Sequence, residues 1–220
     1  MLILGFPSGA LQANCYVVAT GPGATCAVVD PGDDAADRVD ELCTEHELTP
    51  VAVLLTHGHF DHVGSAAELC ARHRIGVYIH VGDRPMLADP MAAVSAQFAA
   101  MLAGQTFPPE PAIVVSVEQS GPLGLAGVPI GAIHTPGHTT GSTCYALPAE
   151  GERPGVLFTG DTLFAGTVGR SDLPGGDGAQ LIRSIREELL AWPDDTVVLP
   201  GHGPASTIGD ERRANPFLRD

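Results

Sequence analysis

Four side chains able to bind a metal lie within the six residues 57–62: His57, His59, Asp61 and His62. Imidazole and carboxylate groups are ligands that a borderline metal ion such as Zn²⁺ accepts in proteins. In a loop, His57 and His59 can point at one metal while Asp61 and His62 turn toward a second. A structural zinc site is closed and usually rich in cysteine, and no cysteine lies in this segment. The pattern therefore predicts a catalytic centre with two metals.

The residues on either side of this segment predict how it is held. The apolar run 51–55 is typical of a buried strand, and residues 64–72 have the composition of a helix start. The metal-binding segment would then be a loop at the carboxyl end of a strand, where open α/β sheets place their sites. This setting argues against a non-specific histidine-rich patch.

The second half of the chain repeats this arrangement three times. A short apolar run leads each time into residues of the metal-binding types: 128–133 into His134 and His138, 156–159 into Asp161, and 196–200 into His202. Neighbouring glycines let the backbone approach closely, and an amphipathic helix is predicted over 179–192. Two β-rich halves with flanking helices predict two sheets packed face to face, with helices outside.

The first half supplies strands predicted over 15–19 and 26–29, with a turn at 21–23 between them. An amphipathic helix is predicted over 35–48. Asp30 stands in the turn after the second strand. It can brace the metal-binding loop from behind, or it can be a turn residue that accepts backbone hydrogen bonds. Both interpretations stay open.

The remaining histidines lack this setting. His46 lies on the predicted helix over 35–48 and is expected to be exposed, and His73 and His80 are expected to be structural. His134 lies four residues before His138, and we expect it to pack or to support the site rather than to bind a metal.

Residues 83–111 are predicted to be a helical insertion near the substrate cleft. Apolar residues recur at roughly helical spacing over 84–103, which is more typical of packing than of cofactor binding. Prolines make the following connection, 105–111, stiff. The insertion could form one wall of the cleft.

The composition predicts one soluble globular domain, residues 1–220. There are 26 acidic residues against 11 basic ones, all arginine, and the net charge is −15. This balance argues against nucleic acid and against anionic membranes, and no apolar run reaches transmembrane length. The first residues lack the basic region of a signal peptide. The five scattered cysteines are expected to be reduced and mostly buried, as in a cytoplasmic protein.

Taken together, these segments resemble the metallo-β-lactamase-fold hydrolases, and within them the small, single-domain glyoxalase II-like (hydroxyacylglutathione hydrolase-like) group. The resemblance rests on four ligand-bearing segments and two others: 57–62, 135–139, 160–164 and 201–204, then 169–177 and 211–217. It implies an α/β fold in which two sheets and their flanking helices form a four-layer αββα sandwich.

The resemblance also implies a set of seven metal ligands. The first metal would be held by His57, His59 and His138, and the second by Asp61, His62 and His202, with Asp161 bridging both. The implied cofactors are two divalent metal ions, zinc first. Iron and manganese also accept histidine and aspartate ligands.

The implied reaction is hydrolysis of S-lactoylglutathione or a similar 2-hydroxyacyl thioester of a small thiol. A hydroxide between two metals forms near neutral pH and can attack the carbonyl carbon, while a metal stabilises the oxyanion. Asp61 would orient the hydroxide. A thiolate leaves as a weak base, so the reaction requires no strong general acid.

Three other functions remain as alternatives. Persulfide dioxygenases share the fold and a similar Gly-Arg-Ser/Thr-Asp segment, but use one iron and need no second site. A lactonase would direct the same hydroxide at a cyclic ester. A non-enzymatic metal-binding protein of this fold generally loses ligands, and here all seven positions are filled.

The substrate contacts follow less directly from the resemblance. Full-length glyoxalase II enzymes continue into a C-terminal helical domain that contacts glutathione, whereas this chain ends eighteen residues after His202. Glutathione is therefore only one of the expected thiols. Arg84 and Arg170 are the candidate contacts to an acidic substrate.

Overall fold

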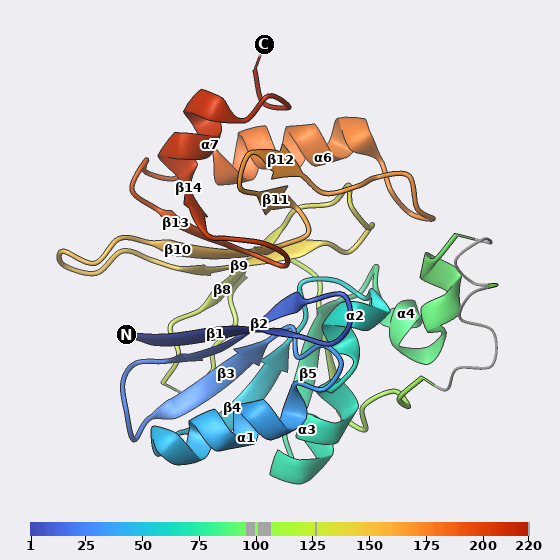
Figure 1. Ribbon diagram of the computed structural model, residues 1–220, viewed down its shortest axis with the longest axis vertical. Helices are drawn as coiled ribbons and strands as arrows, with labels where there is room; N and C mark the ends of the chain where they lie inside the picture. The colour runs from blue at the N-terminus through green and yellow to red at the C-terminus, as the bar shows by residue number, and fades with distance from the viewer. Residues whose placement is uncertain (96–99, 101–106, 126, 220) are drawn as a thin grey trace.

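Two six-stranded sheets form the centre of the computed structural model (Figure 1), which describes residues 1–95, 100, 107–125 and 127–219. The strands of the first sheet, in their spatial order, are β1 (Leu2–Ser8), β2 (Ala13–Ala19), β3 (Thr25–Val29), β4 (Thr49–Leu54), β5 (Gly76–His80) and β6 (Val114–Val117). β1 to β3 pair antiparallel, and β3 to β6 pair parallel. The predicted hairpin around 21–23 is confirmed, because β2 and β3 pair antiparallel across it.

The second sheet is built from the second half of the chain. Its spatial order is β14 (Ser206–Thr207), β13 (Val197–Pro200), β10 (Val156–Gly160), β9 (Thr143–Leu147), β8 (Gly131–His134) and β7 (Gly121–Pro122). Only β10 and β13 pair parallel in it. A two-stranded hairpin, β11 (Leu163–Phe164) and β12 (Thr167–Val168), follows β10.

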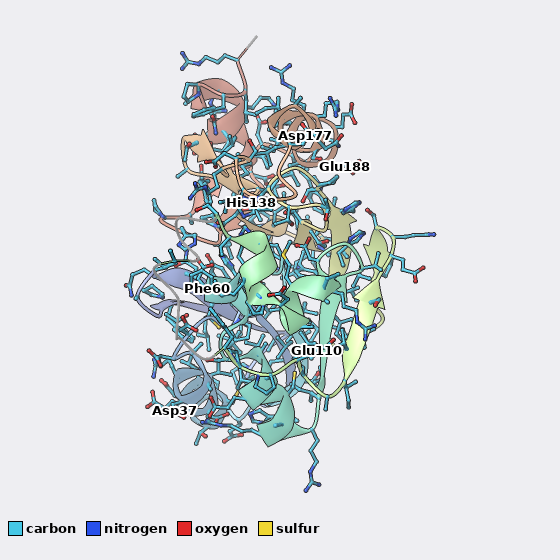
Figure 2. All side chains as sticks on the ribbon, turned by 90° about the vertical axis from the view of Figure 1, so that its right-hand side faces the viewer. Asp37, Phe60, Glu110, His138, Asp177 and Glu188 are labelled. Atoms are coloured by element: carbon cyan, nitrogen blue, oxygen red, sulfur yellow. The ribbon has the colours of Figure 1, made fainter. Side chains whose placement is uncertain are left out.

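Helices cover the outer face of each sheet (Figure 1). The first sheet is covered by α1 (Ala36–Glu45) and α3 (Ala66–His73), and the second by α6 (Gly178–Ser184), its π-helical continuation η2 (Ile185–Leu189) and α7 (Ile208–Ala214). Figure 2 shows His138 in the middle of the molecule, between Asp37 on one helix layer and Glu188 on the other. The predicted four-layer αββα sandwich is confirmed.

Three apolar cores alternate with the layers, because successive side chains of a strand point to opposite faces. In β2, Cys15, Val17 and Ala19 pack against the helix side of the first sheet, and Tyr16 and Val18 pack toward the second sheet. Another cluster lies under α6. Since central strands are buried on both faces, their sequences read as continuous apolar runs.

The five cysteines are all free and buried. Sγ of Cys26 and Sγ of Cys43 lie 4.0 Å apart without forming a disulfide. The expectation of buried cysteines is therefore confirmed, and none of the five forms a disulfide in the structure. Among the described residues, none of the helices has both the length and the apolarity needed to cross a membrane.

The region after β5, where apolar residues recur at helical spacing over 84–103, does not begin with one continuous helix. There, α4 (Arg84–Ala88) ends before Pro90, and a short 3₁₀ helix, η1 (Pro90–Ala93), follows. The residue before a proline is disfavoured in helical conformation, and Asp89 has φ −135° and ψ 81°. The described start of the predicted insertion is therefore helical, but as two short helices separated at Asp89. Residues 96–99 and 101–103 lie outside the described part of the chain.

Two other predicted elements have different bounds. The strand predicted over 128–133 begins only at Gly131, because Val128 and Ile130 donate their backbone N–H groups to the carbonyls of Leu125 and Val128 rather than to a neighbouring strand. The helix predicted over 179–192 ends at Leu189. Val128 and Ile130 are nevertheless buried, and so are Leu181, Ile185 and Leu189 of the helix.

Candidate metal centre

The seven predicted ligands meet at one end of the sandwich. Both sheets contribute: His57 and His59 follow β4, Asp61 and His62 lie on α2 (Phe60–Val63), His138 lies between β8 and β9, Asp161 follows β10, and His202 follows β13. Their ligand atoms form three overlapping groups, each within 4.8 Å: His57, His59 and His138; His57, His62 and Asp161; Asp61, His62 and His202. The structure thus brings together all seven side chains.

The first group, His57, His59 and His138, is the more buried of the two predicted sites. Nδ1 of His59 lies 3.0 Å from Nε2 of His138. The ring of His57 stands edge-on to both other rings, with centroids 4.7 Å apart. Three nitrogens therefore converge from two different loops.

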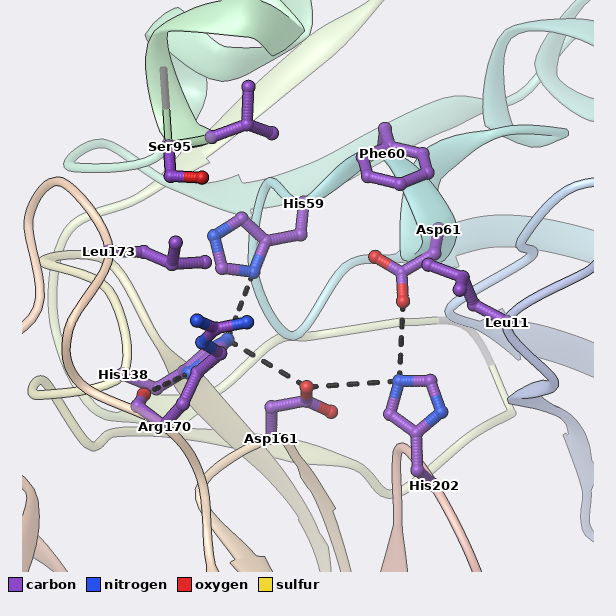
Figure 3. A pocket seen from close by; sticks show the side chains of 11 residues that line it. Leu11, His59, Phe60, Asp61, Ser95, His138, Asp161, Arg170, Leu173 and His202 are labelled. Carbon is purple, nitrogen blue, oxygen red and sulfur yellow. Dashed lines mark hydrogen bonds and ion pairs between the residues drawn. The ribbon is translucent and has the colours of Figure 1, made fainter. Parts of the chain in front are cut away.

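The second group, Asp61, His62 and His202, lies beside the first. Oδ2 of Asp61 is 3.2 Å from Nε2 of His202 and 3.7 Å from Nε2 of His62. Figure 3 shows Asp61 and His202 facing one another across the cleft, with Asp161 beside them.

Asp161 lies between the two groups. Its Oδ2 is 3.8 Å from Nε2 of His138 and 3.8 Å from Nε2 of His202, and its Oδ1 is 3.4 Å from Nε2 of His62. The carboxylate therefore faces ligands of both groups. Gly160, the residue before it, has φ +47°, which favours glycine, and a side chain there would collide with Thr56.

Hydrogen bonds behind the histidines determine which ring nitrogen faces the centre. Thr56 donates its hydroxyl proton to Asp30 at 2.6 Å, so this oxygen accepts from Nδ1–H of His57 at 3.0 Å. Nδ1 of His62 contacts the Asp30 carboxylate at 3.0 Å, and Nδ1 of His138 contacts the Arg170 carbonyl at 2.7 Å. Each ring is then left with Nε2 available as a ligand.

Asp30 thus has both roles that its sequence position allowed: it braces the loop from behind, and it is a turn residue. It braces the metal-binding loop, since its carboxylate also accepts the backbone N–H of Thr56 at 2.7 Å. It is also a turn residue, with φ +48°, a conformation that aspartate tolerates better than most residues.

Three buried atoms that face this centre have no hydrogen-bond partner within the described protein: Nε2 of His57 and of His62, and Oδ1 of Asp161. A buried polar atom without a partner costs about 1–3 kcal/mol, so such a cluster is unusual unless ligands satisfy it. Imidazole nitrogens and carboxylate oxygens are the donor set of divalent Zn, Fe and Mn. The residues present therefore fit divalent metals.

The protonation states also suit metal binding. Burial, with its neighbouring histidines, holds the pKa of His57 well below the ordinary value and that of His59 at about 4. Burial alone would raise the pKa of Asp61 and Asp161, but His62 and the other histidines beside them lower both. Near neutral pH the two carboxylates are therefore ionised, and His57 and His59 are neutral, as metal ligands must be.

A cleft of about 490 Å³ opens onto the centre (Figure 3). Five of the seven ligands line it, together with Leu11, Phe60, Val94, Ser95, Arg170 and Leu173. Val94 and Ser95 belong to the predicted insertion 83–111, so the described part of that insertion reaches the cleft wall. The Arg170 guanidinium is paired with Asp172, at 2.8 and 2.9 Å.

The other predicted residues lie outside this cluster. Arg84 contacts Glu110 at 3.6 Å and Ser116 at 3.4 Å, away from the residues that line the cleft. His73 pairs with Asp40 at 2.7 Å. The His46 side chain is 27 % exposed, less than expected for an exposed position.

His80 and His134, expected to be structural, stack on one another. Their ring centroids are 3.9 Å apart and their planes differ by 9°. Nε2 of His134 contacts the carbonyl of Thr140 at 3.0 Å, within the loop that carries His138. Their contacts described here are with each other and with nearby backbone.

Two residues that support the site were missed in the sequence. Asp83 follows β5 just as the other site residues follow their strands, but one aspartate after a strand is a weak signal. Asn14, at the start of β2, gives no signal at all, because its partners lie 186 and 189 residues away along the chain.

Comparison with known proteins decides the family. The sequence model of the Metallo-beta-lactamase superfamily matches residues 8–202. The chain belongs to this superfamily. Its membership and the His/Asp cluster support a metal-dependent hydrolase that uses divalent metals.

Relatives in this superfamily cover almost the whole chain. A Mycobacterium tuberculosis protein without an assigned function is 47% identical, covering 99% of this chain and 98% of its own. The probable metallo-hydrolase YqgX of Bacillus subtilis is 37% identical (96% and 95%). The hydroxyacylglutathione hydrolase GloC of Haemophilus influenzae is 36% identical (96% and 95%).

Solved structures are similar over equal lengths. The BLEG-1 B3 metallo-beta-lactamase has a TM-score of 0.86 at 36% identity, covering 100% of both chains. TTHA1623 in a di-iron-bound form has a TM-score of 0.81 at 39% identity, covering 98% of this chain and 100% of the other.

Proposed function

We propose that this chain hydrolyses a 2-hydroxyacyl thioester of a small thiol, with S-lactoylglutathione as the reference substrate, at a centre of two divalent metals. The observation that carries the proposal is the position of Asp161, between a complete three-ligand group on each side. The GloC relative, a hydroxyacylglutathione hydrolase, supports the substrate class.

When bound, two divalent metals supply an activated water nucleophile near neutral pH and Lewis-acid stabilisation of the oxyanion. His57, His59 and His138 would hold the first metal, Asp61, His62 and His202 the second, and Asp161 both. We propose that both metal ions are zinc. Iron is its direct competitor, because the di-iron-bound structure is of a 39% identical protein.

The protein's own groups do the positioning. Asp61 is ionised and lines the cleft, so its carboxylate can accept a hydrogen bond from the attacking water and orient it toward the acyl carbon. Apolar side chains at the cleft wall, Leu11, Phe60 and Leu173, can contact the acyl and thiol portions of the substrate and exclude water from them.

The leaving group needs little help from the protein. As the C–S bond breaks, the electron pair goes to sulfur, and the resulting thiolate is a weak base that leaves without a strong general acid. The described cleft residues include Arg170 as their one cation, already paired with Asp172. A thiol portion with few negative charges is therefore the better fit.

The complete second group favours hydrolysis over the alternative of a mononuclear iron persulfide dioxygenase. Such an enzyme needs one metal on a His₂-carboxylate face. It would have no use for Asp61, His62 and His202 gathered within 4.8 Å of one another.

Two measurements on purified protein test the proposal. Inductively coupled plasma mass spectrometry gives the metal content, and a thiol assay follows hydrolysis of S-lactoylglutathione and of the lactoyl thioester of a neutral thiol. We expect about two metals per chain and turnover that chelation abolishes. One iron with oxygen consumption on a persulfide, and no thiol release, would show a dioxygenase. Turnover of a lactone alone would show a lactonase, and metal without turnover a binding protein.

A further inference from the structure

Asp83, in the turn after β5 of the first sheet, and Asn14, on β2 of the same sheet, each hold a loop of the second sheet that carries a predicted ligand. We propose that they are positioning residues with separate targets: Asp83 sets the geometry of the site formed by His57, His59 and His138, and Asn14 sets that of the site formed by Asp61, His62 and His202. The inference rests on the proposed dinuclear centre.

Asp83 is completely buried and bridges the two loops of the first site. Its Oδ2 accepts the backbone N–H of Gly58, the residue between His57 and His59, at 3.1 Å. The same oxygen accepts the hydroxyl of Thr139, next to His138, at 2.6 Å. Its Oδ1 accepts the backbone N–H of Gly141 at 2.7 Å.

The backbones at this bridge approach so closely that only glycine fits. A Cβ on Gly58 would lie 2.7 Å from Cβ of Met86 and 3.0 Å from the carbonyl oxygen of Asp83, and a Cβ on Gly141 would lie 2.6 Å from the backbone nitrogen of Asp83. One carboxylate therefore fixes the spacing between a loop of the first sheet and a loop of the second. That spacing determines whether three nitrogens can reach the same metal.

Asn14 makes the corresponding contacts around His202. Its backbone N–H donates to the carbonyl of Gly201 at 2.7 Å, and its Nδ2 donates to the carbonyls of Pro200 and Gly203, both at 3.0 Å. These three carbonyls flank His202 on both sides. The hydroxyl of Tyr16, on the same strand, also donates to Pro200, at 2.7 Å.

The two residues therefore act on different loops. The contacts of Asp83 involve 58 and 139–141, whereas those of Asn14 involve 200–203. Groups that orient metal ligands from behind typically change metal affinity by about 10- to 100-fold when removed. A purely structural role would instead lower stability and weaken both sites together.

The test measures Zn²⁺ affinity, by chelator competition, in two backgrounds that each keep one site. His202→Ala keeps the first site, and His59→Ala keeps the second. We expect Asp83→Ala to weaken Zn²⁺ binding roughly 10- to 100-fold in the His202→Ala background, and by less than about threefold in the other. Asn14→Ala should show the reverse pattern, so that each variant is the control for the other.

Milder variants keep the test decisive if an alanine variant unfolds. Thr139→Val removes one of the three bonds to Asp83, and Asn14→Asp keeps the side-chain size but removes both Nδ2 donors. Circular dichroism and thermal unfolding show whether each protein is folded. Equal losses in both backgrounds, or no loss in either, would overturn the proposal.

The wild-type protein separates failure of this inference from failure of the proposed function. Two Zn²⁺ per wild-type chain, without thioester hydrolysis, would refute the function and leave the positioning roles to be judged from the variants. A single Zn²⁺ per wild-type chain would refute the dinuclear centre and, with it, the role of Asn14.

Discussion

The carboxylate of Asp30 contacts Nδ1 of His62 at 3.0 Å, and both side chains are at most 2 % exposed. The same carboxylate accepts the hydroxyl of Thr56, which in turn accepts Nδ1–H of His57. Asp30 therefore orients one proposed ligand in each metal site. In this it differs from Asp83 and Asn14, whose contacts each involve one site.

Replacing Asp30 with asparagine should weaken both metal sites. Oδ2 of Asp30 accepts both the Thr56 hydroxyl and Nδ1–H of His62, and Oδ1 accepts the Thr56 backbone N–H. An amide NH₂ in either position would face a donor and could not accept its proton. We expect Zn²⁺ affinity to fall about 10- to 100-fold in both single-site backgrounds, measured by chelator competition. A loss confined to one background would show that Asp30 orients only one of the two histidines.

Asp161→Ala should reduce both metal content and turnover. Removing the carboxylate that faces both groups leaves each metal short of a ligand, and we expect kcat to fall roughly 100-fold or more. Plasma mass spectrometry and thiol release measure the two effects. Asp195→Ala, at an exposed position, is the matched control. Two retained metals with full activity would refute the bridging assignment.

Metal binding at the second site should depend on pH. The hydrogen bond that His202 donates to Asp61 raises the pKa of His202. For His62 the neighbouring Asp161 and Asp61 outweigh burial, so that its pKa is also raised. Below these raised pKa values both rings carry a proton that must leave before Nε2 can bind a metal. Zn²⁺ affinity should therefore rise with pH.

Calorimetry in the His59→Ala background checks this expectation. Titrations at pH 6 and pH 8, in buffers of different ionisation enthalpy, report how many protons each bound Zn²⁺ releases. We expect release at both pH values, larger at the lower one. Affinity and proton release that do not change with pH would show that His62 and His202 are neutral in the metal-free protein.

The Arg170→Ala variant tests separately the contact of the Arg170 carbonyl with His138 and the contact of its guanidinium with the substrate. The bond to His138 uses the Arg170 carbonyl, which the substitution keeps, so metal content should not change. The guanidinium is exposed and paired with Asp172, and an exposed charge contact contributes about 0.2–1 kcal/mol.

We therefore expect the KM for S-lactoylglutathione to rise less than about fivefold in this variant, with no change for the ester of a neutral thiol. Steady-state kinetics on both esters measure the effect. A large loss of kcat, or equal effects on both esters, would show that Arg170 does something other than contact an anionic thiol.

The chemistry of the site could be predicted from the sequence because it depends on local spacing. His57, His59, Asp61 and His62 are close together in any fold that keeps this loop, and a strand before it aims the loop at a sheet edge. The apolar runs that precede the predicted ligands also predicted the strands of the two packed sheets, because the side chains of central strands are buried on both faces.

The helical spacing of apolar residues did not show where the helix after β5 ends, because a proline opposes that spacing locally. The apolar spacing over 84–103 is helical, but Pro90 lacks a backbone N–H and disfavours helical conformation at Asp89, so that the helix ends at Ala88. The periodicity of apolar residues indicates which side chains are buried. Where a helix ends can instead depend on the backbone conformation of a single residue.

The sequence by itself determined the ligand types, their order and the layers. Only the tertiary structure decided which of these side chains meet and what holds them, since His59 and His138 are 79 residues apart and Asn14 and Pro200 are 186 apart. No local pattern encodes such distances. They depend on how two sheets pack face to face, and that packing places Asp83 and Asn14 against loops they never approach in sequence.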